Sequence, residues 1–193
     1  MDEMNLNFDF YLDDSTIKEL DSAADMSLSA PTFDENETFR PGKKDGLGTW
    51  TELFKVRETA LTPPKDGKKD GSQIVFKVTL EVLGGAEGGF DKNTGKVHYY
   101  NAFIDKATLA DKSDKMYPIL ARRIGTINSL LKAVGVPMET GGVNYKEWFE
   151  GTDGDKPMVG QIVKGTVRKY EYDNKRTGEK GVRSVDIDGF SAL

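Results

Sequence analysis

Apolar and polar residues alternate along several stretches of the chain, and this two-residue period predicts β-strands. The clearest stretch covers residues 72–83, in which every second position is apolar: Ile74, Phe76, Val78, Leu80 and Val82. The same period predicts four further strands, over residues 49–61, 96–104, 157–172 and 181–190. Connections rich in glycine, proline and lysine separate these stretches, as is typical of turns.

The predicted strand over residues 96–104 carries aromatic residues on both of its faces. One face holds Val97, Tyr99, Asn101 and Phe103. The other face holds Lys96, His98, Tyr100 and Ala102. We expect His98 and Tyr100 to face solvent, whereas a register shifted by one residue would place Tyr100 in the core.

A spacing of three and four residues between apolar positions predicts one long helix over residues 119–135. Its apolar stripe consists of Leu120, Ile124, Ile127, Leu131 and Val134. Pro118 suits the first turn of a helix, and Gly135 followed by Pro137 suits its end. A short second helix is predicted over residues 144–150.

The order strand-strand-strand-helix-strand-strand is typical of the OB-fold, a mainly β, five-stranded Greek-key barrel. A β-sandwich would need about seven strands, and a ferredoxin-like domain would need a helix after the first strand. Residues 62–71 do not supply that helix, because the segment is short and rich in proline and glycine. The sequence therefore predicts an OB-fold-like barrel, with β-bulges at Gly160 and Gly165 in its fourth strand.

The formal net charge of −5 combines two regions of opposite sign. Residues 1–40 contain eleven acidic and two basic residues, a net charge of −9, and the rest contain 25 basic and 21 acidic residues, a net charge of +4. We therefore predict a flexible, acidic and largely disordered N-terminal tail over residues 1–42. The mildly basic domain then covers residues 43–193.

The composition excludes several functional classes. The chain has no cysteine and a single histidine, which removes disulfide scaffolds, thiolate nucleophiles, zinc ribbons and histidine-rich metal sites. No phosphate-binding loop, dinucleotide fingerprint or nucleophile elbow is present, so we expect a non-enzyme that needs no metal or cofactor. No apolar run reaches the length of a membrane span and the N-terminus lacks signal-peptide features, so we expect a soluble, cytoplasmic protein with no membrane partner.

The predicted fourth strand has the pattern of a surface that binds a single nucleic-acid strand. One of its faces alternates Lys164, Thr166, Arg168, Tyr170 and Tyr172. The opposite face holds Val159, Val163 and Val167. Cations neutralise phosphates, and tyrosine rings stack on bases of any sequence.

OB-folds bind ligands on the face of strands two and three and between two loops, and both corresponding loops of this chain are basic. The candidate nucleic-acid-binding residues are Lys55, Arg57, Lys65, Lys68, Lys69, Lys77, His98, Tyr100, Lys164, Arg168, Tyr170, Tyr172, Lys175 and Arg176. Taken singly, each of them is also an ordinary resident of a solvent-facing strand or loop. Taken as a set over several strands and both loops, they favour nucleic acid.

Aromatic and acidic residues alternate near the start of the predicted tail, which suits a peptide that docks on a basic partner. The candidate partner-binding residues are Phe8, Asp9, Phe10, Asp13 and Asp14. The alternative is a solvated leader that makes no specific contact.

Three segments of the chain are distinctive when taken together. They are the run Asn101-Ala102-Phe103-Ile104-Asp105, the helix over residues 119–135 with its Arg122-Arg123 pair, and the hairpin over residues 160–190. In these segments the chain resembles small bacteriophage single-stranded DNA-binding proteins of OB-fold type. The resemblance covers residues 46–190 and implies a non-catalytic protein that coats single-stranded DNA in phage DNA replication, recombination or repair, in the cytoplasm of a bacterial host. It also implies replication or recombination proteins as partners of an acidic tail, which many such proteins carry at the C-terminus and this chain carries at the N-terminus.

Two other functions stay open at this point. The barrel could be a protein-interaction module whose acidic tail mimics nucleic acid towards a basic partner. A metal-dependent nuclease is the third candidate. RNA is an alternative ligand to DNA, and the oligomeric state is not fixed by the sequence.

Overall fold

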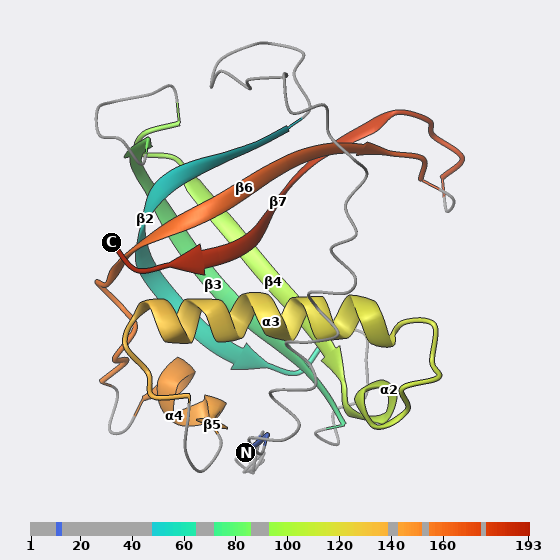
Figure 1. Ribbon diagram of the computed structural model, residues 1–193, viewed down its shortest axis with the longest axis horizontal. Coiled ribbons are helices and arrows are strands. Elements are labelled where there is room, and N and C mark those ends of the chain that lie inside the picture. Colours follow the sequence, from blue (N-terminus) through green and yellow to red (C-terminus); the bar gives the residue numbers. More distant parts are fainter. Residues whose placement is uncertain are drawn as a thin grey trace, which may run out of the picture.

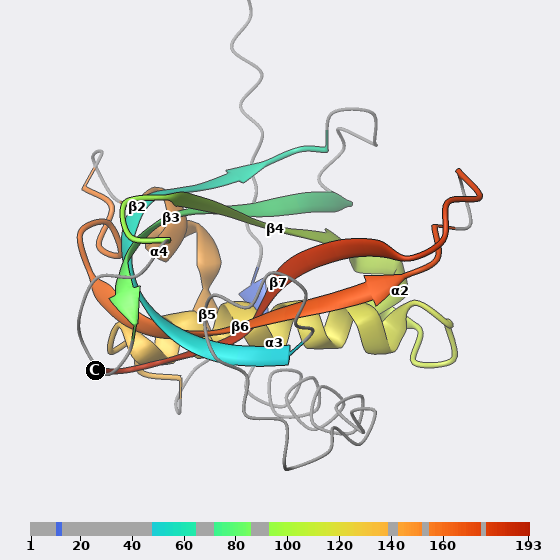
Figure 2. The ribbon, with the colours of Figure 1, turned by 90° about the horizontal axis from the view of Figure 1, so that it is seen from above.

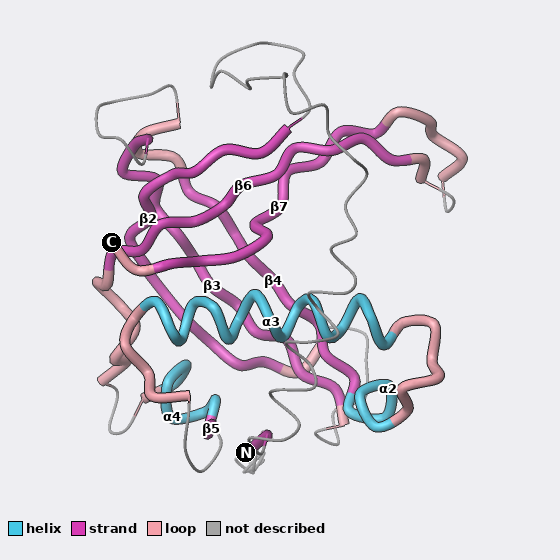
Figure 3. The backbone as a smooth tube through the Cα atoms, viewed as in Figure 1, coloured by secondary structure: helices cyan, strands magenta, loops and turns pink. Residues whose placement is uncertain are grey.

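The computed structural model describes residues 11–12, 48–64, 72–85, 93–138, 143–151, 155–174 and 177–193 of the chain. Most of the predicted tail and the tips of two predicted loops lie outside these residues. The described part is mainly β, with few helices (Figure 3). None of its helices is long and apolar enough to cross a membrane.

Five strands of the described chain form one antiparallel sheet, in the order β4-β3-β2-β6-β7 (Figure 1). They are β2 (Gly48–Thr62), β3 (Gln73–Gly85), β4 (Val97–Asp105), β6 (Ile162–Tyr172) and β7 (Val182–Ser191). The sheet is open, because its edge strands β4 and β7 are not paired with each other. The five predicted strands are confirmed, with boundaries that differ by a few residues.

The central strand, β2, changes neighbours along its length. Residues 48–55 pair with β6, with Lys55 opposite Ile162, and residues 52–62 pair with β3, with Leu61 opposite Phe76, so residues 52–55 lie between both neighbours. A register shift between Val56 and Glu58 marks a bulge, and bulges bend strands. Figure 2 shows the result, in which β2 curves from the layer that contains β3 and β4 into the layer that contains β6, β7 and the long helix.

The long helix, α3 (Tyr117–Ala133), covers the open side of the sheet and packs against both edge strands (Figure 1). The predicted apolar stripe is confirmed, because its first four residues are buried and Val134, just after the helix, packs half-buried against the core. The hydroxyl of Thr126 donates to the carbonyl of Asp188, and the hydroxyl of Ser129 accepts from the amide of Phe190. These bonds provide hydrogen-bond partners for two backbone groups of β7, which lies at the edge of the sheet.

Four shorter elements complete the described fold. The predicted second helix is confirmed as α4 (Tyr145–Glu150), and it follows β5 (Val143–Asn144), whose Asn144 side chain caps the helix. The rings of Tyr145 and Phe149 pack edge-on against Phe76 in the core. Three elements were not predicted, α2 (Lys106–Ala110), β1 (Tyr11–Leu12) and β5, and β1 pairs antiparallel with β5.

The predicted start of the fourth strand, at residue 157, is wrong. Residues 157–160 form a turn, and Gly160 adopts a φ of 90° in it, so β6 begins only at Ile162. Val159, expected on the apolar face, is therefore 40% exposed. The bulge predicted at Gly165 is not found in the pairing with β2, in which Gly165 lies regularly opposite Glu52. In the pairing with β7, a register shift falls between Thr166 and Val167.

Candidate nucleic-acid interface

The outward placement expected for His98 and Tyr100 on β4 is wrong. Tyr100 is 7% exposed, its ring meets Phe190 edge-on, and its hydroxyl lies 3.5 Å from the carbonyl oxygen of Arg123. Burial raises the pKa of Tyr100, against the opposing effects of a hydrogen bond with Thr126 and of the nearby arginines. His98 is half-buried on the same side and meets the Phe54 ring edge-on, with 5.7 Å between ring centroids.

The residue that β4 exposes is Tyr99, whose exposed fraction is 74%. It lies opposite Thr79 of β3, and the next pair along the sheet is Lys77 and Asn101, both of which are exposed. We call Lys77, Thr79, Tyr99 and Asn101 the β3–β4 face. Sequence reasoning missed Tyr99 and Asn101, although the alternation of polar Asn101 with Ala102 and Ile104 pointed to this orientation.

The two predicted cations of β2 lie beside a carboxylate. Lys55 is half-buried and lies opposite Glu81 of β3. Arg57 forms an ion pair with the same Glu81, with 2.8 Å between Nε and Oε2. This part of the outer surface is therefore of mixed charge, and an anionic ligand there competes with Glu81.

The alternation predicted for the fourth strand is confirmed within β6. Val163, Gly165 and Val167 are buried on the core side. The other side carries the residues that we call the β6 face, which are Lys164, Thr166, Arg168, Tyr170 and Tyr172. Tyr170 is half-buried, and Tyr172 is 43% exposed.

Three side chains of the β6 face form a continuous stack. The guanidinium carbon of Arg168 lies 4.8 Å from the ring centroid of Tyr170, and the rings of Tyr170 and Tyr172 lie 6.0 Å apart at 39°. The Nε of Arg168 is also 2.9 Å from a carboxylate oxygen of Asp188. An arginine held over an aromatic ring beside a second ring extends the surface on which bases can stack.

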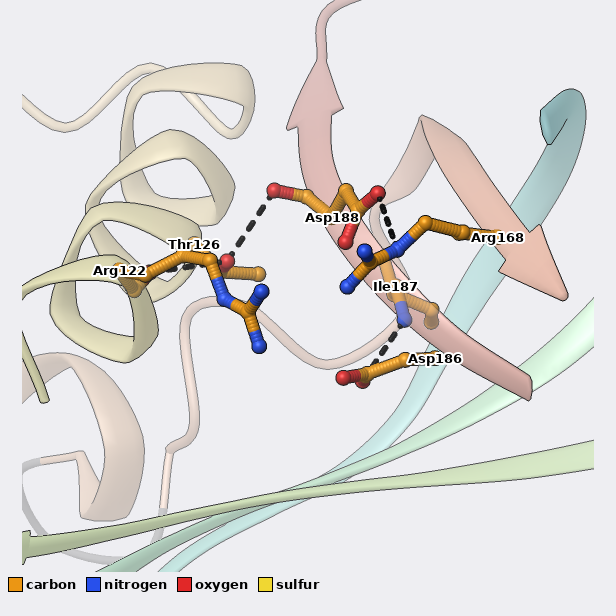
Figure 4. A network of polar contacts seen from close by, with 6 residues as sticks. All are labelled: Arg122, Thr126, Arg168, Asp186, Ile187 and Asp188. Atoms are coloured by element: carbon orange, nitrogen blue, oxygen red, sulfur yellow. Dashed lines mark hydrogen bonds and ion pairs between the residues drawn. The ribbon is translucent and has the colours of Figure 1, made fainter. Parts of the chain in front are cut away.

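A charged network surrounds Arg168 at the junction of α3, β6 and β7 (Figure 4). Figure 4 shows Arg122 reaching from α3 and Arg168 from β6 towards the segment that contains Asp186 and Asp188. Burial raises the pKa of the Asp188 carboxyl above its ordinary value, while Arg168 and Arg122 act in the opposite direction. The Asp186 carboxylate accepts a hydrogen bond from the amide of Ile187, 2.9 Å away.

Trp50, near the start of β2, is fixed in place by a buried carboxylate. Its indole Nε1 donates to Glu52, 2.8 Å away, and the side-chain amide of Asn93 donates to the same oxygen at 2.8 Å. Glu52 is fully buried and Trp50 packs half-buried against the core. Trp50 therefore contributes to the packing of the core.

The structure separates the described candidates into two surfaces. The β3–β4 face belongs to one layer of the molecule and the β6 face to the other, with β2 curving between them (Figure 2). Candidates in the loops and in the tail lie outside the described residues: Lys65, Lys68, Lys69, Lys175, Arg176, Phe8, Asp9, Phe10, Asp13 and Asp14. Within the described part of the chain, no group of three or more histidines or carboxylates is arranged to hold a metal ion.

Comparison with known proteins matches no family model and no curated protein.

Proposed function

We propose that this protein binds single-stranded DNA without catalysis, through a barrel of OB-fold type. The open five-stranded sheet supports this fold, since the OB-fold is a partly open five-stranded barrel. The helix α3 follows the third strand of the sheet and packs against both edge strands. This arrangement supports a barrel whose remaining gap is filled by a helix.

One observation carries the functional proposal, namely that tyrosine rings lie accessible beside cations on the outer faces of the strands. Tyr99 is 74% exposed on the β3–β4 face, where Lys77 lies on the neighbouring strand. Tyr172 is 43% exposed on the β6 face and continues the stack of Tyr170 and Arg168. Stacking of a base on an aromatic ring contributes about 1–3 kcal/mol and tolerates any sequence.

The charges support binding that is modest in affinity and sensitive to salt. The domain carries a net charge of only +4, and both Arg57 and Arg168 are already paired with carboxylates. Phosphate contacts lose affinity as the salt concentration rises. Coating of single strands during phage replication, recombination or repair is the role that we propose for such binding.

Fluorescence anisotropy with labelled oligonucleotides tests the proposal. At low salt we expect the full-length protein to bind a single strand more tightly than a duplex of the same sequence. Tyr99→Ala should weaken this binding by about 1–3 kcal/mol, whereas Tyr99→Phe, which keeps the ring, should leave it nearly unchanged. Absence of binding at low salt, or equal or tighter binding to duplex, would overturn the proposal; tighter binding to an RNA strand would reassign the ligand.

One observation favours a second function, that of a protein-interaction module. The strand β5 accepts β1 as an added antiparallel strand, with Tyr11 opposite Asn144. Addition of a strand to a free edge is a common mode of peptide recognition. Under this alternative, deletion of residues 1–42 abolishes binding to a basic protein partner and leaves DNA binding unaffected.

A further inference from the structure

Arg122 and Arg168 come from distant parts of the chain and meet at one place. Arg122 lies in α3 and Arg168 in β6, and both side chains point towards the Asp186–Asp188 segment of β7 (Figure 4). Both arginines lower the pKa of the Asp188 carboxyl, against the larger effect of burial. Two guanidinium groups from two elements therefore face one small region of the surface.

The two neighbouring arginines of α3 have different environments. The Nη1 of Arg123 donates to the carbonyl of Phe103 at 3.0 Å and so ties the helix to β4. Arg122 is half-buried, and its guanidinium makes no hydrogen bond or ion pair with the described residues. A planar group with five donors is thus held beside the network with its donors available.

Arg168 is only partly engaged in the free protein. Its pairing with Asp188 uses Nε, and no described residue pairs with its two terminal nitrogens. The side chains of Arg168 and Asp188 are 20% and 18% exposed. Because burial raises the pKa of the Asp188 carboxyl, a carboxyl that loses Arg168 takes up a proton more readily than an exposed one does.

We propose that Arg122 and Arg168 together bind one phosphate of a single-stranded DNA backbone, which displaces the Asp188 carboxylate from Arg168. Guanidinium groups match the oxygens of phosphate in geometry and charge. Tyr170 and Tyr172, stacked beyond Arg168, then receive the adjoining bases. This inference rests on the proposed function and deepens it, because it brings the helix α3 into the interface and makes Asp188 an internal competitor of the phosphate.

The test measures the affinity of the full-length protein for labelled oligothymidylate over a series of salt concentrations. Loss of one phosphate contact to a single strand lowers the slope of log K against log salt by about 0.7. We expect that reduction for Arg122→Ala and for the longer, uncharged Arg122→Gln, which serves if the alanine variant is unstable. Arg122→Lys should restore the slope, since it restores the charge.

Arg123→Ala is the matched control, because it removes a neighbouring arginine that contacts the backbone of β4. It should lower the melting temperature and leave the salt slope unchanged. Asp188→Asn should tighten binding about two- to fivefold at low salt, as expected for loss of a competing, partly exposed ion pair. This inference would be overturned if the salt slope is unchanged in both uncharged variants of Arg122, or if Asp188→Asn binds more weakly. In either case, binding of single-stranded DNA by the wild type would still support the proposed function. Absence of wild-type binding would instead overturn the proposed function itself.

Discussion

At the scale of single residues, the ring of Phe54 leaves no room for a side chain at Gly165. A Cβ atom added at Gly165 would lie 2.5 Å and 2.7 Å from two ring carbons of Phe54, which is fully buried. We expect Gly165→Ala to lower the free energy of unfolding by about 1–3 kcal/mol, because the core must shift to admit the methyl group. Urea unfolding followed by circular dichroism measures this.

The matched control for Gly165 is Gly189, which lies on the adjacent strand β7. A Cβ there meets only the hydroxyl oxygen of Ser129, at an ordinary 3.7 Å. Gly189→Ala should therefore change the free energy of unfolding much less than Gly165→Ala. Equal effects of the two variants would contradict the steric explanation.

The buried hydroxyl of Tyr100 predicts a dependence of stability on alkaline pH. Burial raises the pKa of Tyr100 above its ordinary value of about 10, so the unfolded chain releases this proton at a lower pH than the folded chain. Its contribution to the free energy of unfolding is thus fully present below pH about 10 and is lost as the pH rises further. Tyr100→Phe should make that loss shallower, as measured by urea unfolding at neutral and alkaline pH.

The control for Tyr100 is its exposed neighbour. Tyr99→Phe removes a hydroxyl from a ring that is 74% exposed, and the alkaline loss of stability should then match that of the wild type. A Tyr100→Phe variant that loses stability as steeply as the wild type would contradict the assignment to Tyr100.

At the scale of the elements, periodicity was informative wherever one face of an element is buried and the other is solvated. The alternation in β3 and the stripe in α3 correctly identify their core faces, because their apolar residues recur at one period. β4 has aromatic residues on both faces, and the long-range contact of Tyr100 with α3 decides which face is buried. Elements as short as α2 and β5 have too few residues for a period to be visible.

The contact between α3 and the edge strand β7 depends on hydroxyl groups whose role the sequence does not reveal. Ser129 accepts from the amide of Phe190 at 2.9 Å. Ser129→Ala should leave that amide without its partner, lower the free energy of unfolding by about 1 kcal/mol and speed hydrogen exchange at Phe190. Ser191→Ala, at the exposed end of the same strand, is the control, and unchanged exchange at Phe190 in Ser129→Ala would argue against the bond.

At the scale of the whole molecule, the candidate site was predictable in its chemistry and only partly in its location. The alternation of cations and tyrosines over residues 164–172 is enough to identify the β6 face from the sequence alone. The sequence could not show that Arg168 is paired with Asp188 or that Arg122 lies beside it. The first contact depends on the pairing of β6 with β7, and the second depends on the packing of α3 on β7. Residue types thus indicate a ligand, while the tertiary contacts decide which cations are available to it.

The distribution of charge over the whole chain leads to a prediction about the acidic N-terminal tail, residues 1–42, which we call the leader. Residues 1–40 carry a net charge of −9 against +4 for the rest of the chain. Under the proposed function we therefore expect the leader to compete with DNA for the basic domain. Deletion of residues 1–42 should therefore tighten binding to single-stranded DNA, most strongly at low salt. Anisotropy titrations over a series of salt concentrations measure this effect.

A matched variant separates the charge of the leader from its docking. Tyr11→Pro retains all the acidic residues of the leader but removes a backbone donor from β1, which pairs with β5, and proline disrupts such pairing. If charge is the cause, Tyr11→Pro binds DNA as the wild type does and only the deletion tightens binding. If both variants tighten binding equally, docking of β1 on β5 holds the leader in its competing position, and if neither does, the acidic leader has no part in DNA binding.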